Sequence, residues 1–321
     1  MSTTGPATVS VADVGGTLDR HYPPAWAQEW DRVGLVLGEP GAPVRRVLCV
    51  VDCVPATVAE ALATGADLIL AHHPLLLRGV SSVAPTTYQG RIVHELIKND
   101  VALFVAHTNA DVASPGVSDA LAARLGLTSL RPLHPPAAGS AAADDAAADD
   151  AAADDAAADD AAADDAGAGS GRGIGRIGRL ARPMTLAQLV THAAAVLPAT
   201  SWGVRAAGDP DRTIRTVAVS GGSGDSYLAD AAAAGVDAYL TSDLRHHPAS
   251  EHLAAGGPAL LDAAHWATER PWLDMVAEVL RRELSIDVVI SDLDTDPWTV
   301  HARSAPSVPA GDTIRTKEAH P

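Results

Sequence analysis

Short apolar strands alternate with helical stretches on both sides of an acidic, low-complexity tract. The pattern predicts three strands and three helices in the first half, at 46–52, 56–64, 67–71, 91–99, 101–106 and 117–125. It predicts four strands and two helices in the second half, at 216–220, 226–234, 237–241, 258–262, 266–284 and 286–291. Such alternation is typical of α/β architecture, so we expect an α/β fold in each half.

Five AAADD units occupy residues 141–165 and mark the clearest boundary in the chain. Paired aspartates recur every five residues and no apolar face develops, so the tract predicts a flexible or partly helical spacer. A Gly-rich piece follows it. We therefore expect a first lobe at 1–134, a low-complexity Ala/Asp and Gly-rich linker at 135–172, a second lobe at 173–302 and a flexible tail at 303–321.

The charge and composition exclude several classes of protein. The formal net charge is −17, and without the ten aspartates of the tract it is −7, which disfavours nucleic acid as the main partner. No basic, apolar leader and no run of about 18 apolar residues occurs, so no membrane span is expected. Only Cys49 and Cys53 are present, which favours buried thiols over redox or metal chemistry and indicates a cytoplasmic protein.

The two halves resemble each other in sequence. Residues 46–51 align with 215–220 and residues 65–70 with 235–240, and both halves then reach a His-His-Pro, at 72–74 and 246–248. The spacing His107-x-x-x-Asp111 returns as His265-x-x-x-Glu269. We interpret this as an internal duplication, in which two similar lobes would place these polar loops on opposite walls of one cleft.

Histidines and carboxylates gather where predicted strands end. His72 and His73 follow one strand directly, and the two His-x-x-x-acid segments follow two others. Ligand sites collect at the carboxyl ends of strands, and imidazole with carboxylate suits Zn, Mn, Fe or a similar divalent ion. Adjacent histidines point different ways, so each can serve one of two neighbouring ions, with Glu269 as a bridge. Each motif alone is more often a solvated surface pair, and His246-His247 can be just that.

A Gly-rich segment at 220–224 follows a predicted strand and precedes a predicted helix. Such a turn can present backbone N–H groups to a phosphate, although it lacks the spacing of a P-loop. A tight turn beside the cleft is an equally good interpretation, and both stay open.

Five ordered motifs resemble the NIF-three-like proteins, dinuclear-metal proteins often named GTP cyclohydrolase I type 2 homologues. They are EWDRVGL at 29–35, AHHPL at 71–75, HTNAD at 107–111, VSGGSG at 219–224 and DAAHWATE at 262–269. The resemblance implies two similar α/β lobes with mixed sheets, facing a shared metal cleft, in a toroidal homohexamer. Some relatives carry an extra small domain between the lobes, where this chain has only the AAADD spacer.

The resemblance also implies two divalent metal ions per subunit and a set of site residues. The implied metal ligands are His72, His73, Asp111, His265 and Glu269, with Glu269 as the bridging carboxylate. His107 would lie close by, where it can assist proton transfer. The candidate substrate-facing residues are Glu29, Asp31, Ser220, Gly221 and Gly222.

The reaction is open to two interpretations. The first is a metal-dependent hydrolase of a nucleotide-like or phosphorylated small molecule. The second is a non-catalytic role in metal handling or as an assembly scaffold. The fold does not distinguish them, and the substrate is not identified by the sequence.

Overall fold

The structure is a computed structural model that describes residues 8–136 and 171–302. The AAADD tract with most of the expected linker, and the expected tail at 303–321, lie outside the described residues. The first half contains α1 (Val11–His21), β1 (Gly34–Leu37), β2 (Arg46–Val50), α2 (Pro55–Thr64), β3 (Leu68–Ala71), α3 (Tyr88–Lys98), β4 (Ala102–Val105) and α4 (Thr108–Val112). Next come α5 (Val117–Arg124), β5 (Leu127–His134) and β6 (Ile174–Thr185).

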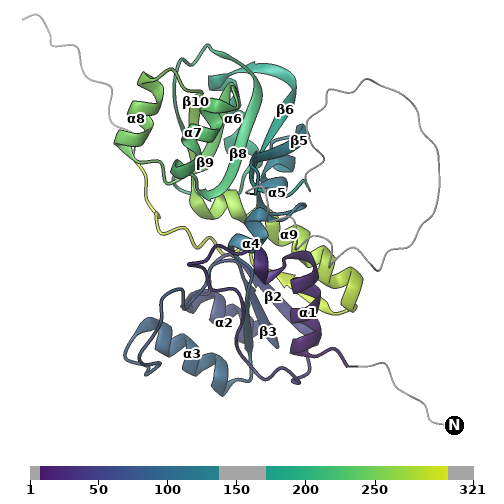
Figure 1. Ribbon diagram of the computed structural model, residues 1–321. Helices are drawn as coiled ribbons and strands as arrows, with labels where there is room; N and C mark the ends of the chain where they lie inside the picture. Colours follow the sequence, from purple (N-terminus) through teal and green to yellow (C-terminus); the bar gives the residue numbers. More distant parts are fainter. Residues whose placement is uncertain (1–7, 137–170, 303–321) are drawn as a thin grey trace, which may run out of the picture.

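The second half repeats the element order of the first. It contains α6 (Leu186–Val196), β7 (Val204–Ala207), β8 (Thr213–Ser223), α7 (Leu228–Ala233), β9 (Ala238–Ser242), α8 (His246–Ala254), β10 (Ala259–Ala263) and α9 (His265–Leu284), and β11 (Asp287–Ile290) follows. The expected α/β architecture with two mixed sheets is confirmed, and Figure 1 shows one sheet in each lobe.

The two sheets share their strand order. One sheet runs β1-β4-β3-β2-β11, and the other, written from its opposite end, runs β7-β10-β9-β8-β6-β5. In each, three parallel strands, β4-β3-β2 or β10-β9-β8, have an antiparallel strand at one edge, β1 beside β4 and β7 beside β10. Beyond them the first sheet adds the parallel strand β11, and the second adds the antiparallel strands β6 and β5. The shared order supports the interpretation of an internal duplication.

Hydrogen bonds repeat between the halves as well. Asp67 Oδ2 accepts from the backbone N–H groups of Arg45 and Arg46 at 2.8 and 3.0 Å. Asp237 Oδ2 accepts in the same way from Arg215 and Thr216, at 2.8 and 2.9 Å. Each aspartate thus holds the backbone just before the buried part of a strand, β2 or β8.

The His-His-Pro segments are not equivalent in the structure. His72 follows β3 directly, whereas Asp243 is the residue that follows β9. His246 and His247 begin α8 on the exposed side of the lobe, so this pair matches the surface interpretation.

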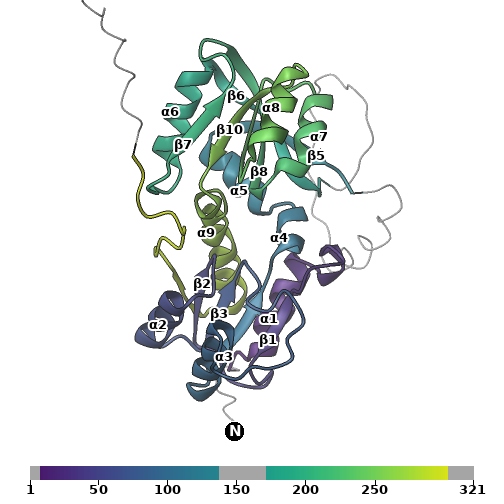
Figure 2. The same ribbon diagram turned by 90° about the vertical axis from the view of Figure 1, so that its left-hand side faces the viewer.

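The sheets do not follow the lobe boundaries that we expected. β5, expected in the first lobe, pairs with β6 in the second sheet, and β11, expected in the second lobe, pairs with β2 in the first. The long helix α9 makes the second exchange possible, because its 20 residues span about 30 Å from one sheet to the other. Figures 1 and 2 both show α9 passing between the lobes.

The first sheet is buried on both faces. Alternate residues of β2, β3 and β4 pack toward α1 and α9 on one face, and toward α2 and α3 on the other. Because both faces are covered, only the ends of these strands remain open for chemistry. Among the described helices, none is both long and apolar enough to cross a bilayer.

Candidate metal centre

His72 and His73 extend the parallel ladder beyond β3. Their backbone N–H groups donate to the carbonyls of Val50 and Val51 at 3.0 and 2.9 Å, which fixes both residues at the strand end. The His72 side chain is fully buried, and its Nδ1 lies 2.9 Å from the carbonyl oxygen of Ala106. His73 Nδ1 lies 2.8 Å from a carboxylate oxygen of Asp52.

Two helix starts bring the other candidate residues. His107 precedes the first residue of α4 and His265 is the first residue of α9, each two positions after the end of a parallel strand. His107 Nδ1 lies 2.9 Å from Asp31 Oδ1, and His265 Nδ1 lies 2.6 Å from Asp243 Oδ2. One turn into α9, Glu269 is 3% exposed.

The candidate ligand atoms converge on one region. His73 Nε2 lies 3.3 Å from His265 Nε2 and 3.1 Å from Glu269 Oε2, and His265 Nε2 lies 3.0 Å from Glu269 Oε1. His72 Nε2 lies 3.6 Å from Glu269 Oε1 and 3.7 Å from Asp111 Oδ1. Two groups with metal-ligand spacing result, and they share His73: one adds His72 and His107, the other His265 and Glu269.

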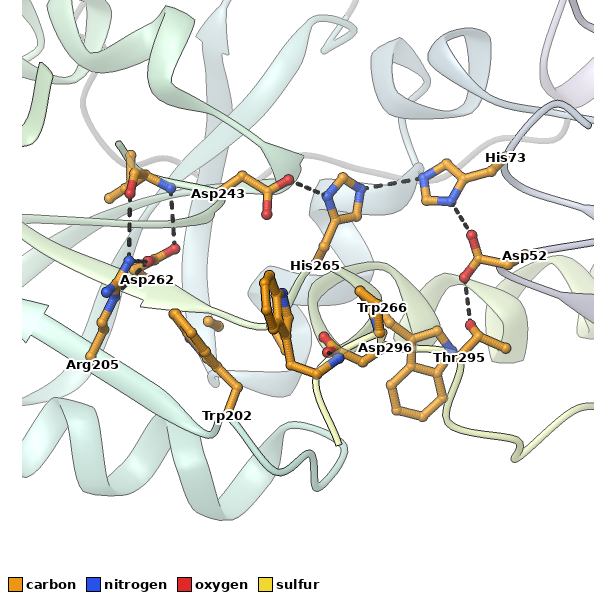
Figure 3. Close-up of a pocket in the computed structure, with 15 residues that line it drawn as sticks. Asp52, His73, Trp202, Arg205, Asp243, Asp262, His265, Trp266, Thr295 and Asp296 are labelled. Carbon is orange, nitrogen blue, oxygen red and sulfur yellow. Dashed lines mark hydrogen bonds and ion pairs between the residues drawn. The ribbon is translucent and has the colours of Figure 1, made fainter. Parts of the chain in front are cut away.

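The four histidines direct the same ring nitrogen toward this region. Each Nδ1 faces a carbonyl or carboxylate oxygen, which can only accept, so Nδ1 carries a proton in all four. In the neutral ring this leaves the Nε2 lone pair free for a cation. Figure 3 shows the arrangement for His265 with Asp243 and for His73 with Asp52. Metal-binding histidines are held by such carboxylate partners.

Two buried polar atoms have surroundings that suit a bound cation. His72 Nε2 is buried and has no hydrogen-bond partner, and the buried Glu269 Oε2 makes no hydrogen bond but has an ion-pair contact with His73 Nε2 at 3.1 Å. An unsatisfied buried group costs about 1–3 kcal/mol, and more when it is charged. A divalent ion bound to both atoms would remove that cost.

The electrostatics of the site agree with the geometry. Burial disfavours the charged forms of His73 and His265. The negative charges of Glu269 and Asp52 nevertheless raise the pKa of His73 to about 10, and those of Glu269 and Asp243 raise the pKa of His265 to about 11. Burial also opposes the ionisation of Glu269, yet the neighbouring histidines hold its pKa well below the usual range. Burial raises the pKa of Asp111 to about 7. In the metal-free site, protons on histidine therefore balance the Glu269 carboxylate.

The predicted neighbours of the site have different positions. Asp31 is buried and accepts from His107, from Thr108 N–H at 3.0 Å and from the Thr108 hydroxyl. Burial opposes its charge, but these hydrogen bonds hold the pKa of Asp31 well below the usual range. Asp31 therefore orients His107, whereas Glu29 is exposed and does not line the cavity beside the ligands.

The Gly-rich segment forms the end of β8. We had expected a separate turn after the strand. The N–H of Gly221 donates to Ser118 Oγ at 3.4 Å, and the N–H of Gly222 donates to Thr268 Oγ1 at 2.9 Å. Those donors are therefore already used within the protein. A Cβ at Gly222 would overlap Glu269 Oε1 and lie 3.0 Å from His265 Nε2, so Gly222 provides room for the ligands.

A cavity of about 340 Å³ adjoins the ligand atoms. Its lining comes from both halves of the chain and includes Gln28, Trp30, His107, Asp111, Ser220 to Ser223, Tyr227, His265 and Glu269. The sequence reasoning missed Asp52 and Asp243, which hold His73 and His265. Both follow buried parallel strands, so the strand-end rule that identified the histidines also applies to them.

The two cysteines take no part in the site. Cys49 and Cys53 are free and buried, and burial raises the pKa of each thiol to about 12. Thiols with such values are largely un-ionised near neutral pH and act as apolar core groups.

Residues 9–297 match the sequence model of the family described as Duf34/NIF3 (NGG1p interacting factor 3). A Streptomyces coelicolor protein named GTP cyclohydrolase 1 type 2 homolog is 49% identical over 302 residues, covering 92% of this chain and 96% of the relative. A Mycobacterium tuberculosis protein of the same name is 42% identical, covering 91% and 97%.

Two solved structures are similar to this chain over most of its length. A Bacillus cereus protein related to NIF3 superimposes with a TM-score of 0.77 at 26% identity, covering 92% of this chain and 99% of that protein. A Staphylococcus aureus protein superimposes with a TM-score of 0.74 at 27% identity, covering 91% and 99%. The fold, the ordered motifs and these similarities agree, and the chain belongs to the Duf34/NIF3 family.

Proposed function

We propose that this protein binds two divalent metal ions and uses them to hydrolyse a phosphorylated or nucleotide-like small molecule. The observation that carries the proposal is the buried His72 Nε2, which has no hydrogen-bond partner and lies 3.6 and 3.7 Å from the carboxylates of Glu269 and Asp111. The name of the relatives, GTP cyclohydrolase 1 type 2 homolog, supports the substrate class.

We assign two ligand sets that share the Glu269 carboxylate, and we leave His107, which stands in the His72–His73–His107 group, for proton transfer. His72, Asp111 and Glu269 would hold one ion, and His73, His265 and Glu269 the other. Imidazole with carboxylate suits Zn, Mn or Fe. When bound, two such metal ions polarise a substrate oxygen and lower the pKa of a water molecule for nucleophilic attack.

The other residues of the cavity have roles that their contacts support. His107 is held by Asp31 through Nδ1, which leaves its Nε2 available to accept or deliver a proton. Trp30 lies edge-on to His107, with ring centroids 5.9 Å apart, and lines the cavity with Gln28. These side chains would orient a substrate beside the ligands and exclude water.

The test is Glu269→Gln, which keeps the shape of the side chain and removes its charge. We expect about two metal ions per chain in the unaltered protein, fewer in the variant, and at least about a hundredfold loss of turnover. Elemental analysis and a panel of nucleotides and phosphate esters measure both. Glu251→Gln, on the exposed face of α8, is the matched control.

Two results would change the proposal. If His72→Ala and His265→Ala both keep full metal content, the ligand assignment is wrong. If the metal-loaded protein turns over no compound of the panel, the hydrolase is excluded and the alternative role in metal handling or as a scaffold takes its place. Assembly into a homohexamer is proposed from the family resemblance, and light scattering measures it.

A further inference from the structure

A segment without helix or strand follows β11 and returns from the first lobe to the second. We call residues 291–298 the clasp, and Figures 1 and 2 both show this part of the chain passing along the outside of the molecule. Its large apolar side chains stay largely in solvent, since Leu293 is 40% exposed and Trp298 is 63% exposed. Burial of apolar surface therefore contributes little to its position, and specific contacts must hold it.

The two ends of the clasp are attached to different lobes. At its start, the Ser291 hydroxyl donates to Glu60 Oε2 on α2 at 2.6 Å. At its end, the Ser201 hydroxyl donates to the backbone carbonyl of Trp298. The Trp298 ring also lies beside Trp202, with ring centroids 6.3 Å apart. The clasp therefore spans the two lobes.

The middle of the clasp reaches the candidate metal centre through one hydrogen bond. The Thr295 hydroxyl donates to Asp52 Oδ2 at 2.5 Å, and Asp52 Oδ1 lies 2.8 Å from His73 Nδ1. Figure 3 shows Thr295, Asp52 and His73 joined in this order. The two oxygens of one carboxylate thus face a clasp residue and a proposed metal ligand.

The Asp52 carboxylate needs both contacts to keep its plane. The terminal torsion of an aspartate has a broad energy profile, so one hydrogen bond alone fixes the carboxylate poorly. The described side-chain partners of Asp52 are His73 on one oxygen and Thr295 on the other. Hydrogen bonds to a charged group are stronger than those between neutral groups. The Thr295 hydroxyl therefore restricts the rotation of the carboxylate that holds the His73 ring.

We propose that Thr295 positions the Asp52 carboxylate and, through it, the His73 ring for its metal ion. Thr295 is a positioning residue, because it acts only through Asp52. The inference rests on the two-metal site of the proposed function but does not require turnover. Coupling between two binding events is reciprocal, so the ion on His73 in turn stabilises the attachment of the clasp.

The two ions respond differently to the clasp. The other proposed ion is held by His72, whose Nδ1 faces the backbone carbonyl of Ala106, and by Asp111. Among the hydrogen bonds of the described residues, none joins the clasp to His72 or Asp111. Loss of the Thr295 hydroxyl therefore weakens one ion and spares the other, whereas a general loss of stability weakens both.

The test is Thr295→Val, which keeps the shape of the side chain and removes the hydroxyl. Competition between the full-length protein and a chelating indicator for Zn²⁺ measures the affinity of each of the two ions. We expect one ion to bind about tenfold more weakly, at the low end of the effect of changing a ligand's own partner, and the other to bind as before. Thr295→Ser keeps a hydroxyl at this position and should restore the lost affinity.

Ser291→Ala is the matched control. It removes another hydroxyl-to-carboxylate hydrogen bond from the same segment, but its partner Glu60 holds none of the proposed ligands. Both Zn²⁺ affinities should match those of the unaltered protein. Circular dichroism checks that all three variants fold.

Hydrogen exchange gives a second measurement that does not depend on affinity. Zn²⁺ should slow the exchange of the backbone amides at 292–298 in the unaltered protein and in Thr295→Ser. The same ion should give much less protection in Thr295→Val, because the link between the clasp and Asp52 is lost.

Four results would overturn this inference. They are unchanged Zn²⁺ affinities in Thr295→Val, equal losses in Thr295→Val and Ser291→Ala, no recovery in Thr295→Ser, or clasp exchange that Zn²⁺ does not slow. A Thr295-dependent affinity without turnover of any compound would keep the role of the clasp and remove the hydrolase. Turnover with Zn²⁺ affinities indifferent to Thr295 would do the reverse, and no uptake of Zn²⁺ by the unaltered protein would overturn both.

Discussion

His73 and His265 stand 192 positions apart in the sequence, yet their Nε2 atoms lie 3.3 Å apart. Behind each ring a carboxylate, Asp52 or Asp243, accepts a hydrogen bond from Nδ1. Two imidazole lone pairs repel each other at this distance unless a proton or a cation lies between them. Binding of a proton or a cation between the two rings is therefore coupled to the contact between the two halves of the chain.

Metal binding is expected to release protons. The pKa values of His73 and His265 are raised to about 10 and 11, so both rings are protonated at pH 7 in the metal-free protein. A bound ion replaces these protons, and metal affinity should fall as the pH falls, by about a hundredfold per pH unit if two protons are displaced. Calorimetry in buffers of different ionisation enthalpy measures the release, and equal heats in all buffers would contradict it.

The carboxylates behind the histidines are expected to control metal affinity. In Asp243→Asn and Asp52→Asn, the side chain loses the charge that favours the Nδ1-protonated ring. We expect each change to weaken metal binding by about 10–100-fold. Competition with a chelator measures the affinity.

Asp287→Asn provides the control for these variants. Asp287 forms a surface ion pair with Arg46 at 2.6 Å, so its substitution removes a charge far from the ligands. Its metal affinity should match that of the unaltered protein. The same loss of affinity in all three variants would show a general charge effect and contradict the positioning role.

Gly222 is expected to be indispensable for metal binding. Its φ is +64°, and a Cβ there would overlap Glu269 Oε1. Gly235 has the same φ of +64°, but no atom lies within 4 Å of its Cβ position. Gly235→Ala should therefore cost only about 1 kcal/mol of unfolding free energy through backbone strain, whereas Gly222→Ala should also lose metal.

Elemental analysis and urea unfolding together separate the two effects at Gly222. Equal metal content in Gly222→Ala and Gly235→Ala would show that the close approach to Glu269 does not matter. A metal loss confined to Gly222→Ala would identify the clash as the cause.

A buried ion pair is expected to stabilise the contact of α5 with β6. Arg176 is 1% exposed and pairs with Asp119 at 2.7 Å. Asp119→Ala leaves the buried guanidinium with carbonyl partners only, which should cost about 3–5 kcal/mol of unfolding free energy. Urea denaturation measures this cost.

The matched control for the buried pair is Asp274→Ala. Asp274 pairs with Arg124 at the surface, where about half of each side chain is exposed, and with Arg270, which also pairs with Asp292, so its loss should cost less than about 1 kcal/mol. Equal losses of stability in Asp119→Ala and Asp274→Ala would contradict the prediction.

Local patterns predicted the central parallel strands and the helices α2, α3, α5, α7 and α9, but not the inner strand β6 or the helices α1, α6 and α8. The apolar runs of β2, β3 and β4 and the helix that ends at Gly65 appear within a few residues of their expected positions. Gly65 has a φ of +68°, as expected for a glycine that ends a helix. The edge strands β1 and β7 were missed because they are short and half-exposed, and so they lack an apolar run.

The candidate site, like the fold, was predicted only in part from the sequence. The sequence by itself determined that histidines and carboxylates stand at strand ends, because strand ends and helix starts are marked by local periodicity and spacing. Only the tertiary structure decided which of them meet. It separated His246 from the site and added Asp52 and Asp243.

The sequence by itself also determined the α/β class and the repeated order of motifs. Only the tertiary structure decided that β5 joins the second sheet, that β11 joins the first, and that α9 connects the lobes. Strand pairing across more than 200 residues depends on how whole layers pack, and no local pattern records it. The 3.3 Å approach of His73 to His265 is a product of that packing.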